Sequence, residues 1–277
     1  MIAVPAGPPS LVVVGKGRLG RALAGAPGLA SKPPVLLSGK EASMDPRLPL
    51  AELLRAGPGT ILVLAVRDDS LLDLARLLGE AAADVPPGAA ALHLSGALGP
   101  GVLDSVRSRG FATGCCHPLQ TFPGTSSDSH RFEGITFAVD GDADGLAAAH
   151  RLCRLLGGKA VRVPASARGV YHLAASLGAN GLTGLVGASR DALVAAGFGP
   201  SEALAALAPL LRSALDEALR LGPEAALTGP AARGDESTLD RHRRALLAWD
   251  ASRAALLEAL LREQKRLAAR SAAGAGC

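Results

Sequence analysis

Three glycines are spaced so that they could hold the phosphates of a dinucleotide. The segment LVVVGKGRLGRALAG at 11–25 places Gly15, Gly17 and Gly20 in a GxGxxG pattern between a predicted strand and a predicted helix. The first glycine permits a tight turn, the second lets a pyrophosphate approach the backbone, and the third lets the helix pack on the strand. N–H groups at the helix start attract phosphates. We predict a dinucleotide site here, rather than a turn without ligand, to which Lys16, Arg18 and Leu19 contribute.

The end of the second predicted strand decides between NADP and NAD. An NAD site usually has Asp or Glu there, which bonds the ribose 2′-hydroxyl. Here VLLSGKE at 35–41 places Ser38 directly after the apolar run and Lys40 two residues later. A hydroxyl and a cation suit a 2′-phosphate, and Lys16 or Arg18 adds positive charge. Glu41 would favour NAD if the strand ended later. We predict NADP (NADPH), with NAD as the less favoured cofactor.

Polar side chains also follow the next strands along the chain. The segment ALHLSGALG at 91–99 ends a strand with His93 and Ser95, and CCHPLQTFPG at 115–124 places His117 after the following strand. Ligands of parallel sheets bind beyond the carboxyl ends of the strands, so these residues should lie near the nicotinamide ring. The predicted cofactor contacts are Ala65, Val66 and Ser95, and the predicted substrate contacts are His117, Gln120 and Thr121.

A third polar segment, GVYHLAASLGANGL at 169–182, lies in a predicted helix. His172, Ser176 and Asn180 recur at a spacing of four, which puts them on one helix face. Each histidine alone is readily explained as a core residue. Three polar groups on one face of an otherwise apolar helix favour a catalytic role for this face.

The elements that must position these residues alternate between strands and helices from residue 11 to about 163. Amphipathic stretches at 68–82 and 142–158 supply helices that pack on a sheet. This alternation predicts an α/β fold with a Rossmann-type parallel sheet. The seven predicted strands are Leu11–Val14, Val35–Leu37, Thr60–Val66, Ala90–Leu94, Ala112–Cys115, Thr136–Val139 and Ala160–Val163.

After Pro164 the pattern is helical, with helices predicted at about 166–197, from Pro200, and at about 237–270. We therefore predict a Rossmann dinucleotide-binding domain at 1–164, an all-α substrate and dimerisation domain at 165–270, and a flexible tail at 271–277. Glycines thin out the first of these helices, so another backbone should approach it closely, within the domain or across a dimer. They are Gly169, Gly178, Gly181, Gly184 and Gly187.

Composition excludes several classes of protein. Of 277 residues 48% are hydrophobic, which excludes disorder of the whole chain, and 3% are aromatic, which disfavours base stacking. The net charge of +4 is spread out, so no nucleic-acid partner is predicted. No run reaches the ~20 apolar residues of a membrane span, and the N-terminus lacks the basic region of a signal peptide. We predict a cytoplasmic protein without a metal, whose Cys115, Cys116, Cys153 and Cys277 are small buried or tail residues.

Five motifs resemble a known family in the same order. They are GKGRLG, HLSGALG, CCHPLQTF, the YH…AN helix and ALTGPAARGD at 226–235. Over about 11–260 the sequence is similar to Rossmann-like NADP oxidoreductases that carry a C-terminal domain of unknown function 2520. The resemblance implies NADP as cofactor and a helical C-terminal domain that tends to dimerise, and it assigns no physiological substrate. The layout is also similar to that of pyrroline-carboxylate reductase, deazaflavin-dependent NADP reductases and β-hydroxyacid dehydrogenases.

One departure from the β-hydroxyacid dehydrogenases bears on the mechanism. These enzymes have a Lys and an Asn four residues apart, and aligning Asn180 with that Asn puts Ser176 in the place of the Lys. The proton donor must then be another group. His172 is the first candidate because imidazole titrates near neutral pH, and His117 is the second. We count these four residues as the catalytic candidates.

The loop TGPAARGD at 228–235 suggests an anion clamp. The Arg233 guanidinium could bind a carboxylate or phosphate in a bidentate manner, and Asp235 could orient Arg233 or His172. Alternatively, Arg233 and Asp235 pair with each other in a helix-capping turn. We list both residues as predicted substrate contacts.

These features together predict an NADP-dependent reductase or dehydrogenase. It would transfer hydride between the nicotinamide and a small carbonyl, imine or hydroxyl compound. The missing Lys motivates an alternative, a non-catalytic module in which NADP occupancy controls a partner or a dimer. The intact glycine loop argues against a purely structural relic of a Rossmann domain.

Overall fold

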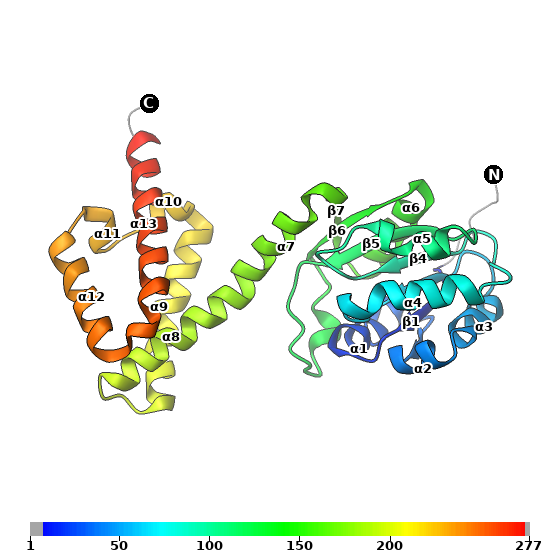
Figure 1. The fold of residues 1–277 in the computed structure, drawn as a ribbon, viewed down its shortest axis with the longest axis horizontal. Helices are drawn as coiled ribbons and strands as arrows, with labels where there is room; N and C mark the ends of the chain where they lie inside the picture. The colour runs from blue at the N-terminus through cyan, green and yellow to red at the C-terminus, as the bar shows by residue number, and fades with distance from the viewer. Residues whose placement is uncertain (1–7, 275–277) are drawn as a thin grey trace. The chain divides into compact units, whose positions relative to one another are not determined.

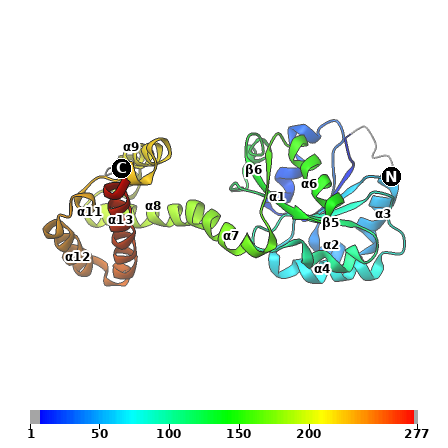
Figure 2. The same cartoon turned by 90° about the horizontal axis from the view of Figure 1, so that it is seen from above.

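The computed structural model describes residues 8–274 and divides the chain into two compact units, Met1–Asn180 and Gly181–Cys277. Figures 1 and 2 show the elements of each unit. The last strand ends at Arg162, next to the predicted boundary at 164/165, and the helical stretch up to Asn180 groups with the first unit. Residues 271–274 of the predicted tail continue the last helix, whereas 275–277 lie outside the described residues.

A seven-stranded sheet with the order β2-β1-β3-β4-β5-β6-β7 forms the centre of the first unit. All seven predicted strands are present, with ends that shift by up to three residues, and the α/β Rossmann-type fold is confirmed. Runs such as Ile61–Leu64 form central strands because they are apolar on both faces of the sheet. The strands are β1 (Leu11–Val14), β2 (Val35–Leu37), β3 (Ile61–Leu64), β4 (Ala90–His93), β5 (Ala112–Pro118), β6 (Thr136–Gly141) and β7 (Lys159–Arg162).

Strand β6 departs from the predicted all-parallel arrangement. It pairs antiparallel with β5, with Cys116 opposite Val139, and β7 pairs parallel with β6. A parallel neighbour needs a crossover of a dozen or more residues, usually a helix. The connection at 119–135, all of it described, contains no helix longer than the turn Asp128–His130. The carboxyl ends of β1 to β5 therefore share one edge of the sheet, away from the ends of β6 and β7.

Helices cover both faces of this sheet, and the layers are visible in Figure 2. Leu23 of α1 and Leu152 of α6 are buried on one face, and Leu53 of α3 and Leu78 of α4 on the other. The predicted helices at 68–82 and 142–158 are confirmed as α4 and α6. The helices of the unit are α1 (Arg18–Ala24), α2 (Gly39–Met44), α3 (Arg47–Ala56), α4 (Asp68–Ala81), α5 (Asp104–Arg107), α6 (Ala143–Leu155) and α7 (Arg168–Ser176).

The predicted long helix at 166–197 is interrupted by a π turn. After α7 the backbone forms a π-helical segment at Leu177–Gly181, and α8 then continues. A π turn bonds residue i to i+5, which changes the angle between successive side chains. Ser176 ends α7 and Asn180 lies inside the π turn, so the regular α-helical geometry behind the predicted shared face extends over His172 and Ser176 only.

The second unit is helical, as predicted. A helix begins at Pro200, and the predicted helix at 237–270 is split by a 3₁₀ turn at Ala251–Arg253, which the Asp250 side chain caps. None of the helices of residues 8–274 is long and apolar enough to cross a membrane. The helices are α8 (Leu182–Ala195), α9 (Pro200–Leu221), α10 (Pro223–Ala226), α11 (Pro230–Arg233), α12 (Glu236–Asp250) and α13 (Ala254–Gly274).

The cysteines of the first unit are buried thiols. Cys115, Cys116 and Cys153 are free and buried, which confirms their prediction as small core residues. The Sγ atoms of Cys116 on β5 and Cys153 on α6 lie 3.5 Å apart. Cys277 lies outside the described residues.

Candidate active site

The glycine loop follows β1, and close packing within the protein requires glycine at two of its positions. Gly15 has a φ of +131°, and a Cβ built on it would lie 2.2 Å from the carbonyl oxygen of Ala65. A Cβ on Gly20 would lie 1.8 Å from the carbonyl oxygen of Gly15. Both distances are shorter than any real contact, so packing between loop, helix and β3 accounts for these two glycines. The predicted cofactor contact Ala65 thus also packs beneath the loop.

Gly17 differs from its two neighbours in the motif. Its φ is −71°, which any residue adopts, and no described atom lies within 4 Å of a Cβ built on it. Gly17 is the N-cap residue of α1, and no side chain of the described residues caps the first turn of this helix. The protein does not require a glycine here, but a phosphate group that approaches the backbone does. The loop therefore fits the pyrophosphate of a dinucleotide.

A polar cavity of about 710 Å³ lies beside this loop. Lys16, Arg18 and Arg21 line it from the loop and from α1, and residues 123–126, 128 and 129 also line it. Arg21 Nε donates to the carbonyl oxygen of Lys16 at 2.8 Å, which holds the loop onto the helix. Sequence reasoning missed Arg21 and the segment 123–129, although the run PGTSSDS carries the small polar residues typical of an anion site. Leu19 is half-buried and packs against the core.

The loop after β2 brings a carboxylate close to the glycine loop. The strand ends at Leu37 as predicted, and Ser38 caps α2 by accepting from Glu41 N at 3.1 Å. The Glu41 carboxylate accepts from Ser38 N at 2.7 Å and pairs with Lys16 Nζ at 3.2 Å. The bond from the Ser38 backbone is the main cause that lowers the pKa of Glu41 to about 2. Sequence reasoning gave Glu41 a role in cofactor choice only if β2 ended later. The strand is not longer, yet the Glu41 side chain still reaches Lys16 of the glycine loop. Lys40 is exposed.

The turn after β4 is rigid and buried. His93 Nδ1 accepts from Ser95 N at 3.2 Å, so Nε2 carries the proton and donates to the carbonyl oxygen of Gly99 at 3.1 Å. Burial lowers the pKa of His93 to about 4 and keeps the ring neutral. The Ser95 hydroxyl accepts from Ala97 N at 3.2 Å and from a second backbone N–H of this turn. His93 therefore shapes the turn, and Ser95 stands at its start.

His117, Tyr171 and His172 gather at the same edge of the sheet. His117 follows β5, and its Nδ1 lies 2.7 Å from the hydroxyl of Tyr171 on α7. The His117 and His172 rings meet edge to face, with centroids 6.0 Å apart. A Cβ on Gly96 would lie within 3 Å of both imidazole rings, so the turn after β4 touches this cluster. Burial, followed by the charges of His172 and Arg168, lowers the pKa of His117 to about 4.

Arg168 lies beneath this cluster as a fully buried cation. Its Nη1 donates to the carbonyl oxygen of Ser95 at 3.2 Å and its Nη2 to that of Ala138 at 3.1 Å. Its Nε has no hydrogen-bond partner among the described residues. None of their carboxylates forms an ion pair with the guanidinium. Sequence reasoning missed Arg168 and Tyr171. The position of Tyr171 next to His172 was a signal that could have identified it. Arg168 had no such signal, because an arginine is usually exposed.

The remaining predicted residues of the first unit surround this edge less closely. Gln120 and Thr121 are exposed, and the Gln120 side-chain oxygen accepts from Thr121 N at 2.8 Å. Ser176 ends α7 half-buried, and Asn180 is exposed in the π turn. Val66 is half-buried after β3.

Arg233 and Asp235 belong to the second unit. Asp235 caps α12 by accepting from Thr238 N at 3.1 Å, and it also accepts from the hydroxyls of Ser237 and Thr238. These bonds, above all those from Thr238, lower the pKa of Asp235 to about 2. No hydrogen bond or ion pair joins Asp235 to Arg233 in the described part of the chain. The capping turn is thus present, but without the pairing that we considered.

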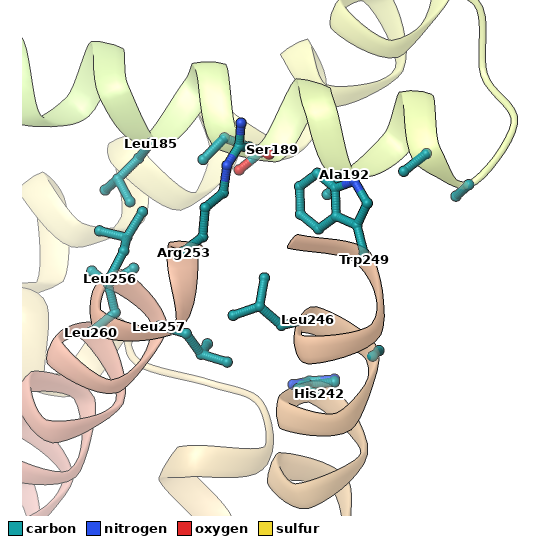
Figure 3. A pocket seen from close by; sticks show the side chains of 14 residues that line it. Leu185, Ser189, Ala192, His242, Leu246, Trp249, Arg253, Leu256, Leu257 and Leu260 are labelled. Atoms are coloured by element: carbon teal, nitrogen blue, oxygen red, sulfur yellow. Dashed lines mark hydrogen bonds between the residues drawn. The ribbon is translucent and has the colours of Figure 1, made fainter. Parts of the chain in front are cut away.

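An apolar groove of about 510 Å³ opens on the second unit (Figure 3). It is lined by Ala188 and Ala192 of α8, Leu246 and Trp249 of α12, and leucines of α13. The Arg253 guanidinium stacks on the Trp249 ring at 4.9 Å and pairs with Asp191 at 2.8 Å, which ties the rim of the groove together. No sequence pattern predicted this groove, because its walls come from three separate helices.

Known proteins resemble residues 135–263 in sequence and nearly all of the chain in fold. Residues 135–263 match the model of the domain of unknown function 2520. A solved structure of a Thermotoga maritima protein is 23% identical, covers 94% of this chain and 98% of its own, and superposes with a TM-score of 0.68. No curated protein matches the sequence.

Two further solved structures are enzymes. The reductive aminase from Aspergillus terreus in complex with NADPH and ethyl levulinate is 18% identical, with 94% of each chain covered and a TM-score of 0.63. The pyrroline carboxylate reductase of Plasmodium falciparum with NADP bound is 14% identical, with 94% of this chain and 98% of that chain covered and a TM-score of 0.57. At these identities the matches establish a common fold. The match of residues 135–263, from β6 to α13, to the domain of unknown function 2520 agrees with the resemblance found in the sequence.

Proposed function

We propose that the protein is an NADP-dependent oxidoreductase that transfers hydride between a nicotinamide and a small carbonyl, imine or hydroxyl compound. The observation that carries this proposal is Gly17. The backbone and packing around it accept any small residue, and only a ligand that approaches the loop explains the glycine. Gly15, Gly20 and the other predicted contacts of the loop, Lys16, Arg18 and Leu19, surround it.

The proposed reaction site is the sheet edge where β3, β4 and β5 end. Ala65, Val66 and Ser95 lie at the ends of β3 and β4, and His117 and His172 add two imidazoles. Rossmann folds bind the ring of their cofactor at this edge. A nicotinamide supplies a hydride when it is bound, and the side chains there supply orientation and a proton path. Two NADP(H) complexes of the same fold support this assignment of the cofactor.

The choice of NADP over NAD rests on the charges around Ser38. Lys40, Lys16 and Arg18 suit a 2′-phosphate, whereas Glu41 holds Lys16 in an ion pair beside the loop. NADP binding therefore requires Lys16 to exchange Glu41 for the phosphate, or Lys40 and Arg18 to bind it without Lys16. Comparison of NADPH and NADH affinities tests this choice directly.

We further propose that the second unit forms a homodimer. Among its described residues only Ala203, Leu207, Ala231, Leu239 and Leu261 are buried, which is few for a unit of this length. Leu210 and Leu219 are 65% and 77% exposed, and no described atom lies within 4 Å of a Cβ on Gly184 or Gly187. A second copy of the chain would cover the apolar groove and these open positions.

The other predicted residues remain candidates for the substrate. Gln120, Thr121, Ser176 and Asn180 lie in the first unit, and Arg233 offers a guanidinium for an anionic substrate group. Asp235 is better explained as a helix cap, since three hydrogen bonds engage its carboxylate.

Titration with NADPH, followed by its fluorescence, tests the proposed cofactor site. We expect Gly17→Ala to weaken NADPH binding more than tenfold while the melting temperature stays unchanged, because the new methyl group meets only the ligand. Gly101→Ala is the matched control, with only one atom, 3.9 Å away, near its new Cβ. The absence of NADPH binding up to millimolar concentration would remove the proposal. Tight binding without hydride transfer to any carbonyl or imine would favour the non-catalytic module.

A further inference from the structure

We propose that Tyr171 is the catalytic proton donor of this site and that His117 is the positioning residue that holds and replenishes its proton. The inference rests on the proposed NADP-dependent oxidoreductase and names the acid that such a reaction needs. Sequence reasoning assigned this role to His172 or His117.

The contact between the two side chains is built by the fold. His117 and Tyr171 are 54 positions apart in the chain, yet Nδ1 and the phenolic oxygen lie 2.7 Å apart. Their rings meet edge to face, at 88° and with centroids 5.6 Å apart. On the other side of the imidazole, a Cβ on Gly96 would lie 2.8 Å from His117 Nε2. The turn after β4 therefore passes so close that only a glycine leaves the ring in place.

The phenol, and not the His117 imidazole, carries the exchangeable acidic proton of this pair at neutral pH. Burial lowers the pKa of His117 to about 4, so the ring is uncharged. Burial raises the pKa of Tyr171 to about 12, so its O–H bond is intact. Around them, Arg168 lowers the pKa of Tyr171, whereas Cys116 and Cys115 raise it. A neutral imidazole is a poor acid, so within this pair the phenol is the donor.

Arg168 explains how so weak an acid gives up its proton. The guanidinium is fully buried, donates only to carbonyl oxygens, and has no carboxylate partner among the described residues. An uncompensated buried cation is costly, and it lowers the energy of any negative charge that forms close by. A developing substrate oxyanion or the Tyr171 phenolate supplies that charge for the time of the reaction.

The proton moves in two balanced steps. When hydride arrives at the carbon of a C=O or C=N bond, the π electron pair moves to the oxygen or nitrogen and binds the Tyr171 hydroxyl proton, and the phenolic O–H bond breaks. The phenolate then takes the proton of His117 Nδ1, while Nε2 takes one from water. His117 ends neutral with its proton on Nε2. Release of that proton to water and uptake of one at Nδ1 restore the resting tautomer, so the solvent has supplied one proton in all. In the resting state, Nδ1–H donates to the phenolic oxygen and leaves the Tyr171 hydrogen free for the substrate.

The chain contains one tyrosine, so the absorbance of phenolate reports Tyr171 alone. The experiment compares the phenolate fraction at about pH 10 in the free protein, with saturating NADP⁺ and with saturating NADPH. The two cofactors differ in the positive charge of the nicotinamide ring. If Tyr171 faces that ring, NADP⁺ raises the phenolate fraction roughly tenfold, which is one pKa unit, and NADPH does not. Tyr171→Phe removes the signal.

Equal phenolate fractions in all three states, with cofactor binding intact, would overturn the role of Tyr171 and leave the proposed cofactor site standing. Failure of both cofactors to bind would overturn the oxidoreductase itself.

The positioning role of His117 is tested with the same signal. His117→Leu removes the donor to the phenolate and should lower its fraction several-fold, and His117→Asn, whose amide also donates, should restore it. A phenolate fraction that stays the same in His117→Leu would overturn this part of the inference. If His117→Leu does not fold, a fraction in His117→Asn that equals the wild-type one supports the role and a lower one contradicts it.

Discussion

The two units of the chain contrast in how they bury apolar side chains. In the first, a sheet with helices on both faces buries two continuous clusters that contain Leu23, Phe137, Leu53 and Leu62. In the second, the cluster of buried residues comprises Ala231, Leu239 and Leu261. The first unit therefore has the core expected of an independent domain, whereas the second leaves most of its apolar side chains exposed. Each of the following measurements sharpens or breaks this contrast.

The largest expected effect is a core deletion in the first unit. Leu62 on β3 is fully buried, so Leu62→Ala should lower the free energy of unfolding by about 2–5 kcal/mol, from lost burial and the cavity left behind. Leu210→Ala is the matched change in the second unit, at a side chain that is 65% exposed. Urea unfolding of both variants measures the difference. If Leu210→Ala costs as much as Leu62→Ala in a monomer, the contrast between the units is wrong.

A charge in the apolar groove should break the proposed dimer. Ala192 lines the groove and is exposed in the single chain, so Ala192→Glu leaves the monomer folded and places an unpaired carboxylate in the interface. We expect the dimer dissociation constant to rise on the order of a hundredfold, since such a charge costs about 3 kcal/mol. Light scattering at a series of concentrations measures it. Ala206→Glu, at an exposed position of α9 that does not line the groove, is the control. A monomeric wild type would contradict the dimer.

We expect that buried histidines of the first unit make the stability of the protein depend on pH. The pKa values of His93 and His117 are lowered to about 4 in the folded protein, mainly by burial. In the unfolded chain these rings take up a proton below about pH 6.5. The unfolded state thus binds more protons between pH 6.5 and 4, and stability falls as the pH falls.

We expect a loss of up to about 1.4 kcal/mol per pH unit for each ring within that window. Urea unfolding at several pH values measures the slope, and His93→Gln should reduce it by about half. His150→Gln, at an exposed ring, is the control. A slope that is the same in His93→Gln as in the wild type would show that this ring is not buried in its neutral form.

The smallest effect should lie at the polar edge of the first unit, where side chains select a ligand and contribute little to stability. Glu41→Gln releases Lys16 from its ion pair, so the affinity for NADPH should rise roughly threefold relative to NADH. Parallel titrations with the two cofactors measure the ratio. A ratio that falls instead would mean that Glu41 does not compete with the phosphate for Lys16.

The sequence was sufficient for the features that depend on neighbours in the chain. Strand runs such as Leu11–Val14, the GxGxxG turn and the helix start at Pro200 follow from local residue types, and the structure places them as predicted. The antiparallel direction of β6 could not be predicted from its own residues. The only indication is that the connection before it lacks a long helix. The π turn at 177–181 was also missed, since glycine-rich helical text does not distinguish π from α bonding.

Sequence patterns suggested residues for the candidate site but not the contacts between them. His117 and His172 were singled out because imidazoles after strands and on helix faces are unusual. Tyr171 and the buried Arg168 were missed, because arginine is usually exposed and only long-range packing brings the Tyr171 hydroxyl to His117. Ser38 was read as a phosphate ligand, and the structure shows that it also caps a helix.

The labelling rate of the buried thiols can report local opening of the first unit. Burial raises the pKa of Cys115 to about 11, and the contact with Cys153 raises that of Cys116 well above its usual range, so reactive thiolate is scarce in the folded state. Alkylation of Cys116 and Cys153 must wait until the sheet and α6 separate. The ratio of their labelling rate to that of an unfolded thiol then gives the free energy of this opening under native conditions, without denaturant.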